Sequence, residues 1–261
     1  MSGNDILGTT MSGLEAGFKV SHIAAFDLKT CLPDSEASRV LDDLMLKDFD
    51  HIPVKDEARI IGVLERKIGS VLGTARNVMR ALDDSMLVSA EESLPKFLPF
   101  LQDSPYRLVV KGTEIQGIVT LSDVAKLPVR LMAFTLVTHL EMLMAGVIRG
   151  KYHTDADFLA ELHPKQRPTV EGRLKNRKKE NLLISALDLS DLGHKITVVG
   201  KILGSTDFQE QLKPIVDLRN SLDHASDFLE ACGSVNAFLT RLKLAEHWIE
   251  ELGAKLPLGI M

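Results

Sequence analysis

One short stretch of the sequence places an arginine, an amide and a histidine at spacings that suit phosphodiester chemistry. Arg219, Asn220 and His224 follow one another in a segment with a helical pattern, and on a helix Asn220 and His224 share a face. Arginine offers a planar fork of donors to phosphate oxygens, and histidine transfers protons near neutral pH. The trio could therefore cleave RNA without a metal: Arg219 would hold the scissile phosphate, Asn220 would orient either partner, and His224 would act as general base or acid.

The same residues also allow a purely structural interpretation. Arg219 and Asp223 stand four residues apart, the spacing of an ordinary surface ion pair that stabilises a helix by roughly 0.2–0.5 kcal/mol. In that case His224 is merely solvated. On one helix His224 lies ~140° from Arg219, so the trio needs a symmetry-related copy to form a single cleft. The catalytic interpretation therefore predicts a two-fold homodimer.

This segment resembles the HEPN superfamily, helical domains that carry an Arg, a polar residue directly after it and a His four to six residues beyond the Arg, here Arg219, Asn220 and His224. The resemblance implies an all-α bundle that dimerises. Many HEPN members are metal-independent ribonucleases, and others have lost activity and serve as binding modules. Two alternatives follow from it: an RNA endonuclease, as a toxin or defence effector with a neutralising partner protein, or a non-catalytic dimeric regulator.

The first half of the chain repeats one pattern. From about Ile23 to Leu127 the sequence reads twice as strand, helix, strand, strand, helix, with a period of about 55 residues. Apolar residues at helical spacing predict the helices, and β-rich runs bounded by turn residues predict the strands. The expected helices are 37–46 and 93–101, and the expected strands are 51–54, 60–64, 106–110 and 115–119.

The second strand-to-helix junction contains Gly117, Thr120, Ser122 and Asp123. The repeat order and this junction resemble the paired CBS domain (Bateman module), whose junction reads Gly, two apolar residues, Thr, two variable residues, Asp. The resemblance implies that these four residues bind a regulatory adenine nucleotide (AMP, ADP or ATP), with Thr120 on a phosphate and Asp123 on the two ribose hydroxyls. The alternative is that Thr120 only caps the helix and Asp123 is only a first-turn acid.

The first repeat departs from this pattern at the matching junction. Glu65 replaces the Thr and Ile68 replaces the Asp. A carboxylate repels a phosphate and an isoleucine cannot bond a ribose, although Arg66 and Lys67 could restore some affinity. We therefore expect an empty or altered cleft there, and one nucleotide per chain.

Pro128 marks the boundary between the halves, because the residue before a proline resists helix geometry and proline favours the first turn of a new helix. The predicted fold is an α+β CBS pair of two β-α-β-β-α repeats followed by an all-α, HEPN-like helical bundle. The expected parts are a flexible N-terminal tail (1–19), the CBS pair (20–128, repeats about 20–75 and 76–128) and the bundle (129–261). Its expected helices are 129–151, 170–187, 189–202, one from about 208, a fresh helix after Pro214, and 235–252.

Composition limits the remaining functions. The chain has 261 residues, of which 45% are hydrophobic, as in an ordinary soluble protein. Two cysteines, Cys31 and Cys232, are too few for a disulfide scaffold, no cluster has metal-ligand spacing, and the N-terminus lacks a secretory pattern, so we expect a cytoplasmic protein. Residues 131–148 imitate a membrane span, but His139 and Glu141 near its middle favour a buried bundle helix.

Charge is unevenly distributed along the chain. Residues 1–128 hold 14 Lys and Arg against 19 Asp and Glu, whereas residues 129–261 hold 17 of each. The acidic surplus argues against nucleic acid binding in the first half. The segment Lys165–Lys179 contains seven positive residues and a single acid, Glu171. Such a run is often a solvated helix face, but here it is also a candidate contact for an RNA backbone.

Overall fold

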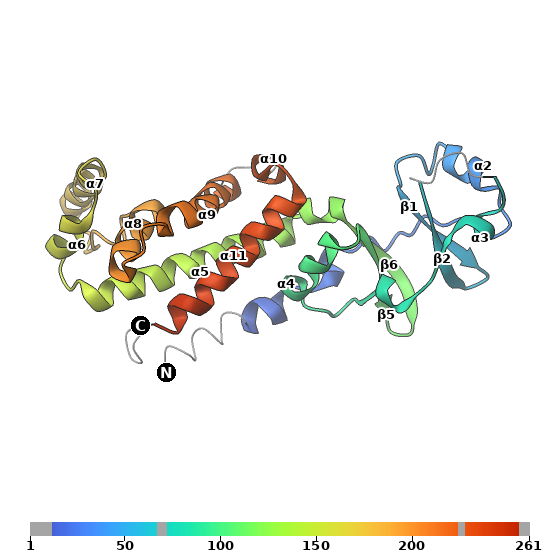
Figure 1. The fold of residues 1–261 in the computed structure, drawn as a ribbon, viewed down its shortest axis with the longest axis horizontal. Helices are drawn as coiled ribbons and strands as arrows, with labels where there is room; N and C mark the ends of the chain where they lie inside the picture. The colour runs from blue at the N-terminus through green and yellow to red at the C-terminus, as the bar shows by residue number, and fades with distance from the viewer. Residues whose placement is uncertain (1–11, 67–71, 224–227, 256–261) are drawn as a thin grey trace. The chain divides into compact units, whose positions relative to one another are not determined.

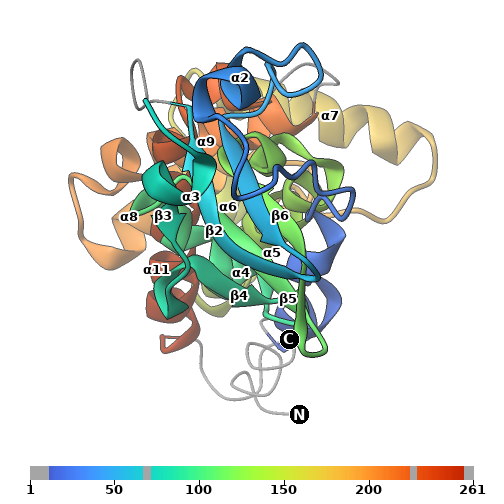
Figure 2. The ribbon, with the colours of Figure 1, turned by 90° about the vertical axis from the view of Figure 1, so that its right-hand side faces the viewer.

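The computed structural model describes residues 12–66, 72–223 and 228–255. The chain divides into two compact units. The two-repeat unit is Glu15–Pro128, and the helical unit contains the chain from Val129 onward. Both are drawn in Figure 1, and the strands of the two-repeat unit are seen from another side in Figure 2.

Among the described residues, the two-repeat unit has two three-stranded sheets. The first sheet has the order β1 (His51–Asp56), β2 (Arg59–Glu65), β3 (Arg80–Ala81), with antiparallel pairing throughout. The second has the order β4 (Leu87–Ser89), β5 (Tyr106–Lys111), β6 (Glu114–Thr120), in which β4 and β5 are parallel and β5 and β6 antiparallel. The four strands expected from the sequence are present and extend one or two residues further than expected.

The helices of this unit are shorter than their sequence pattern predicted. The α-helices are α2 (Ala37–Asp42), α3 (Ala75–Val78) and α4 (Leu94–Phe97). The 3-10 helices are η1 (Val20–His22), η2 (Asp84–Met86), η3 (Leu98–Gln102) and η4 (Leu121–Ala125). The second expected helix, 93–101, is thus an α-helical turn that continues as 3-10 helix, with a proline near the start of each part.

The two repeats exchange short segments. Ala25, which precedes the first repeat's strands, pairs with Ile118 of β6 through two backbone hydrogen bonds of 2.8 and 3.0 Å. In the other direction β3, which follows the first repeat's strands, pairs with β2. Each sheet is therefore completed by a segment from the other side of the repeat boundary.

A glycine makes room for each exchanged segment. A Cβ on Gly62 would lie 2.5 Å from the carbonyl oxygen of Arg80, and one on Gly117 would lie 3.0 Å from the ring of Phe26 and 3.1 Å from the carbonyl of Ala25. All three distances are shorter than ordinary van der Waals contact, so only glycine fits at either position without a shift. Gly117 is accordingly buried in β6 as a packing residue.

The helical unit is built of helices, most of which are longer than those of the two-repeat unit. They are α5 (Leu127–Lys151), α6 (Asp155–Glu161), α7 (Arg167–Lys179), α8 (Leu192–Leu203), α9 (Phe208–Asp223), α10 (Phe228–Cys232) and α11 (Val235–Gly253). α9 contacts α8, α10 and α11. Its buried residues Phe208, Leu212, Ile215, Leu218 and Leu222 recur at helical spacing and form the face that these neighbours cover.

Two expectations for this unit were wrong. The expected helix 170–187 ends at Lys179, because Asn181 adopts a left-handed backbone with φ 58° and residues up to Ser190 continue without a helix. The expected fresh helix just after Pro214 is not a separate element, because Pro214 lies inside α9 and the helix continues past it. A proline inside a helix costs about 3 kcal/mol, and the apolar face that continues past it offsets this cost by burial.

α5 is long and apolar enough to cross a membrane by length and composition, and 61% of its most apolar window is buried within the protein. Its His139 is 4% exposed, and Glu141 forms an ion pair with Lys195 of α8 at 2.7 Å. A buried core helix of a globular protein has the same length and composition. In this structure α5 acts as such a helix for the unit.

Candidate functional site

The β6–η4 junction brings Thr120 and Asp123 together. The backbone N–H and the hydroxyl of Thr120 both donate to Oδ2 of Asp123, at 2.6 and 3.1 Å. Oδ1 of Asp123 pairs with the ammonium of Lys126 at 2.7 Å, and Lys126 also donates to the Ile23 carbonyl at 2.5 Å. Asp123 is only 8% exposed, so in this conformation its carboxylate stabilises the start of η4 and the neighbouring chain.

The two other predicted nucleotide-binding residues lie in different surroundings. Gly117 is buried in β6 beside Phe26. Ser122 follows Thr120 in η4 and is exposed. At this junction, therefore, Ser122 presents a hydroxyl to solvent, while Asp123 would have to exchange its bonds to Thr120 and Lys126 for bonds to a ribose.

At the matching junction of the first repeat, Glu65 already has a hydrogen-bond partner within the protein. Glu65 accepts a hydrogen bond of 3.0 Å from the hydroxyl of Tyr106, whose ring lies 4.3 Å from the His51 ring. Burial, and then the charge of Glu65, raise the pKa of Tyr106 above its ordinary value. The phenol therefore stays protonated and donates to the carboxylate that replaces the threonine.

Arg66, which could have restored phosphate affinity there, is committed elsewhere. Its guanidinium donates to the carbonyls of Leu41, Leu46 and Phe49 at 2.5, 2.7 and 3.1 Å. These three backbone acceptors, in α2 and the turn that follows it, use most of the fork that a phosphate would need. Lys67 and Ile68 lie outside the described residues.

Sequence reasoning missed a cavity of about 660 Å³ at the hairpin ends of the two sheets. Lys55 of β1 and Lys111 of β5 contribute one ammonium from each repeat, and Asp27 and Glu114 contribute carboxylates. Phe26 is 41% exposed, and the Lys111 ammonium lies 5.6 Å from its ring centre. These residues come from separate segments of the chain, so no local motif could reveal the cavity.

The hairpin-end cavity offers the three kinds of contact that a nucleotide uses. Two ammonium groups can bind phosphate oxygens, and carboxylates can accept bonds from ribose hydroxyls. The exposed ring of Phe26 offers a stacking surface for a base. The cavity and the β6–η4 junction lie at opposite ends of β6, which puts them ~20 Å apart along the strand.

The structure describes two of the three predicted catalytic residues. Arg219 and Asn220 lie in the last turns of α9, where Asn220 is exposed. The Arg219 guanidinium binds Asp223 at 2.5 Å, with side chains 41% and 36% exposed. The i,i+4 surface pair is thus formed in this conformation, and His224 lies outside the described residues.

The end of α9 is also held by a residue that the sequence did not single out. Arg130 of α5 donates to the Leu222 carbonyl through Nη2 and Nε, at 2.6 and 3.1 Å. A cation at the C-terminus of a helix satisfies an otherwise unbonded carbonyl and interacts favourably with the helix dipole. Arg130 therefore fixes the position of the turn that carries Arg219 and Asn220.

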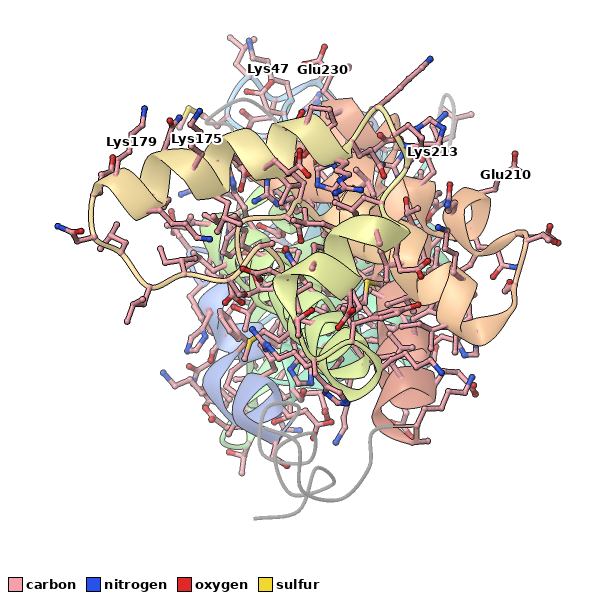
Figure 3. All side chains as sticks on the ribbon, turned by 90° about the vertical axis from the view of Figure 1, so that its left-hand side faces the viewer. Lys47, Lys175, Lys179, Glu210, Lys213 and Glu230 are labelled. Atoms are coloured by element: carbon pink, nitrogen blue, oxygen red, sulfur yellow. The ribbon has the colours of Figure 1, made fainter. Side chains whose placement is uncertain are left out.

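The basic segment 165–179 is largely helix α7, and its charges are partly neutralised. Three of its arginines form ion pairs of 2.7 to 2.9 Å with Glu171, Asp191 and Glu180. Within the described parts of the chain, no ion pair involves the exposed residues Lys175, Lys178 or Lys179. Figure 3 shows Lys175 and Lys179 projecting from α7 into solvent.

Comparison with known proteins gives matches of structure. No protein-family model matches the sequence, and no curated protein matches it. The CBS domain of a bacterial CNNM/CorC family Mg2+ transporter in complex with ATP is 18% identical, over 46% of this chain and 93% of that chain, with a TM-score of 0.37. CBSX2 in complex with AMP is 17% identical, over 44% of this chain and 98% of that chain, with a TM-score of 0.38.

A CBS domain pair/ACT domain protein from Thermotoga maritima is 20% identical, over 41% of this chain and 92% of that chain, with a TM-score of 0.34. These structure neighbours are CBS domain proteins, and each covers less than half of this chain. The rest of the chain is consistent with an all-α domain.

Proposed function

We propose that this chain is a nucleotide-responsive regulatory protein, in which the two-repeat unit binds an adenine nucleotide and the helical unit carries the response. The observation that carries the proposal is the hairpin-end cavity, where Lys55, Lys111, Asp27 and Phe26 line one space of about 660 Å³. That volume lies within the ~300–1,000 Å³ of ordinary small-molecule sites. The bound CBS proteins among the structure neighbours carry ATP or AMP.

The β6–η4 junction, with Gly117, Thr120, Ser122 and Asp123, is the second place at which the nucleotide could bind. It has the residues that the CBS resemblance implies, and Ser122 is exposed there. Binding there requires Asp123 to give up bonds within the chain. Binding in the hairpin-end cavity leaves those bonds intact, and for that reason we favour the cavity.

Calorimetric titration of the full chain with ATP, ADP and AMP tests the proposal. We expect Lys55→Ala and Lys111→Ala each to weaken ATP binding about tenfold, because each removes one charge-assisted bond of roughly 1.5 kcal/mol. The matched control is Lys47→Ala, an exposed lysine of the same unit, which should bind as the wild type does. If both cavity variants bind ATP as the wild type does and Asp123→Asn loses binding, the nucleotide site is at the β6–η4 junction. If the wild type binds none of the three nucleotides, the proposal is wrong.

A separate measurement tests whether nucleotide binding changes the helical unit. A nucleotide can shift the helical unit only if that unit has two states that the nucleotide distinguishes. Hydrogen exchange of the α5 and α9 peptides with and without the tightest-binding nucleotide reads this out directly. Identical exchange in both conditions would leave a nucleotide-binding protein without a regulated helical unit.

A second candidate function is metal-independent RNA cleavage by a homodimer, with Arg219, Asn220 and His224 as the catalytic residues. The exposure of Asn220 and the half-exposed Arg219 at the end of α9 favour it, as do the exposed lysines of α7. Arg219 would have to leave Asp223 to hold a phosphate. This function would suit a toxin or defence effector with a neutralising partner protein.

Incubation with mixed RNA in EDTA, with and without ATP or AMP, tests cleavage. We expect products with 2′,3′-cyclic phosphate ends and a loss of at least ~100-fold in His224→Ala. His153→Ala, an exposed histidine of the same unit, is the matched control. Equal cleavage by both variants would assign the activity to a contaminant, and intact RNA with the wild type under every condition would leave the regulatory function alone.

A further inference from the structure

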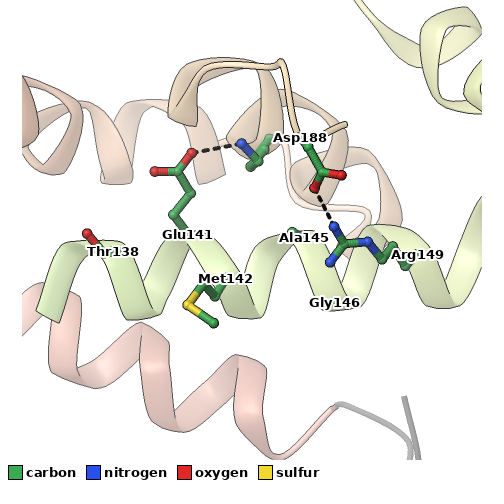
Figure 4. A pocket seen from close by; sticks show the side chains of 8 residues that line it. Thr138, Glu141, Met142, Ala145, Gly146, Arg149 and Asp188 are labelled. Carbon is green, nitrogen blue, oxygen red and sulfur yellow. Dashed lines mark hydrogen bonds and ion pairs between the residues drawn. The ribbon is translucent and has the colours of Figure 1, made fainter. Parts of the chain in front are cut away.

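A second cavity, of about 650 Å³, lies in the helical unit between α5 on one side and, on the other, α8 and the chain that leads into it. Its apolar lining is Met142, Ala145 and Gly146 of α5, and its polar lining includes two ion pairs, Glu141 with Lys195 and Arg149 with Asp188. Figure 4 shows these side chains around the cavity. An apolar wall with a few convergent polar groups is the usual composition of a small-molecule site.

Lys195 is the unusual residue of this cavity, because its side chain is only 6% exposed. Its ammonium donates to Oε1 of Glu141 and to the Ser190 carbonyl, both at 2.7 Å. Removing a charged pair from water costs several kcal/mol, and an apolar residue at this position could fill the same space without that cost. Among the described residues, Oε2 of Glu141 accepts no hydrogen bond, so this oxygen remains available to a donor in the cavity.

Arg149 and Asp188 differ in how many of their hydrogen-bonding groups have a partner within the protein. Asp188 accepts bonds on both oxygens, from Arg149 on Oδ1 and from the Ser185 hydroxyl on Oδ2 at 2.6 Å. Arg149 uses one of its N–H groups for Asp188, and within the described parts of the chain its other N–H groups have no acceptor. Its side chain is 51% exposed. The arginine fork therefore retains room for a carboxylate.

The spare acceptor and the spare donors are set apart along one helix. Glu141 and Arg149 are eight residues apart on α5, a rise of ~12 Å. Met142 and Arg149, seven residues apart, lie on nearly the same face, with Ala145 and Gly146 between them along the helix. A ligand that contacts both ends must therefore pass over the apolar wall.

We propose that this cavity binds a small amphipathic carboxylate. Its carboxylate binds the fork of Arg149, its apolar body lies against Met142, Ala145 and Gly146, and an ammonium or hydroxyl at its far end donates to Oε2 of Glu141. The net charge of the cavity is zero, because it is lined by two acids and two bases, Glu141, Asp188, Arg149 and Lys195. A bound zwitterion leaves that net charge at zero, whereas a simple anion or cation adds an uncompensated charge. The site lies wholly within the helical unit, and this proposal does not rest on nucleotide binding to the two-repeat unit.

The test uses 6-aminohexanoate, hexanoate and hexylammonium as probes on the full chain with ¹³C-labelled methionine methyl groups. The Met142 methyl lines the cavity, and Met45, 78% exposed in the two-repeat unit, is the internal control. We expect the Met142 signal to shift and saturate with a Kd on the order of millimolar, as small fragments do, while Met45 does not move. 6-Aminohexanoate should bind most tightly of the three.

Variants then assign the two ends of the ligand. Arg149→Ala should weaken 6-aminohexanoate and hexanoate at least fivefold and leave hexylammonium unchanged, and Glu141→Gln should reduce 6-aminohexanoate to the affinity of hexanoate. Lys151→Ala, an exposed cation at the end of the same helix, should bind as the wild type does. Because Arg149 is half exposed, its variant should fold even if Glu141→Gln does not. The proposal is overturned if no probe shifts Met142, or if Arg149→Ala and Lys151→Ala bind hexanoate equally.

Discussion

Replacing Asp123 separates its contribution to the stability of the fold from its predicted role in binding the ribose of a nucleotide. The carboxylate accepts two bonds from Thr120 and pairs with Lys126, and it is 8% exposed. Loss of a helix cap costs roughly 0.5–2 kcal/mol, and the half-exposed Lys126 adds at most about 1 kcal/mol. Asp123→Ala should therefore lower the free energy of unfolding by about 2 kcal/mol without any nucleotide.

Asp123→Asn gives a graded intermediate. The amide oxygen can still accept from the Thr120 N–H, whereas the attraction to Lys126 is lost, so we expect a cost of about 1 kcal/mol. Asp48→Ala is the matched control, because Asp48 is exposed and makes no hydrogen bond or ion pair with a described residue. Its cost should stay below about 0.5 kcal/mol.

Urea unfolding followed by far-ultraviolet circular dichroism measures these costs. With a slope of roughly 1–3 kcal/mol per molar urea, the midpoint of Asp123→Ala should fall by about 1 M. An equal midpoint for Asp123→Ala and Asp48→Ala would refute the structural role of the carboxylate. Repeating the Asp123→Asn series with AMP adds the ligand test: if AMP raises its midpoint as much as that of the wild type, Asp123 does not hold the ribose.

Three further results are expected. Gly62→Ala should lower the stability of the two-repeat unit by about 1–3 kcal/mol in the same urea assay, because its Cβ would lie 2.5 Å from a backbone oxygen of β3. Burial lowers the pKa of His139. The unfolded chain therefore binds more protons below about pH 6.5, stability falls as the pH falls through that value, and His139→Leu should flatten the dependence of the unfolding midpoint between about pH 7 and 5. If α7 contacts RNA, Lys175→Gln with Lys179→Gln should reduce the salt slope of binding, measured by fluorescence anisotropy, by roughly 1.4.

Two of these results have a control variant in the chain, and the third has a result that would contradict it. A Cβ on Gly17 meets nothing within 4 Å, so Gly17→Ala should not destabilise, and equal losses in both glycine variants would contradict the close approach of β3. Lys213 is an exposed lysine of α9, and a Lys213→Gln variant with the salt slope of the α7 double variant would argue for diffuse attraction. An unchanged pH profile in His139→Leu would show that the buried imidazole does not set acid sensitivity.

The sequence predicted the four longer strands well because their signal is local. β-branched runs bounded by turn residues mark β1, β2, β5 and β6 to within two residues. The ends of helices were predicted less well where the backbone conformation of a single residue ends the helix. The apolar run around Leu182 and Leu183 reads as helix, but the left-handed backbone of Asn181 stops α7 before it.

Features that join distant parts of the chain could not be predicted. The pairing of Ala25 with Ile118 and the cavities with Lys55 and Lys195 each need residues from separate elements. For the candidate sites, residue type alone could not show that Asp123 and Arg219 already have partners within the chain. Helical spacing did foresee the Arg219–Asp223 pair as the alternative to a phosphate contact.

The exchanged segments also constrain how this protein is made. The residue that closes the second sheet, Ala25, leaves the ribosome long before β6 exists, and the Lys126 ammonium that holds the Ile23 carbonyl follows 103 residues later. The segment around Ala25 must therefore wait without its partner until β6 has been synthesised, whereas the first sheet can form once β3 has followed β2. Contacts between such distant residues slow folding and leave strand edges open meanwhile. A nascent chain stopped between the repeats is consequently a substrate for chaperones, whereas one completed past Lys126 can also close the second sheet.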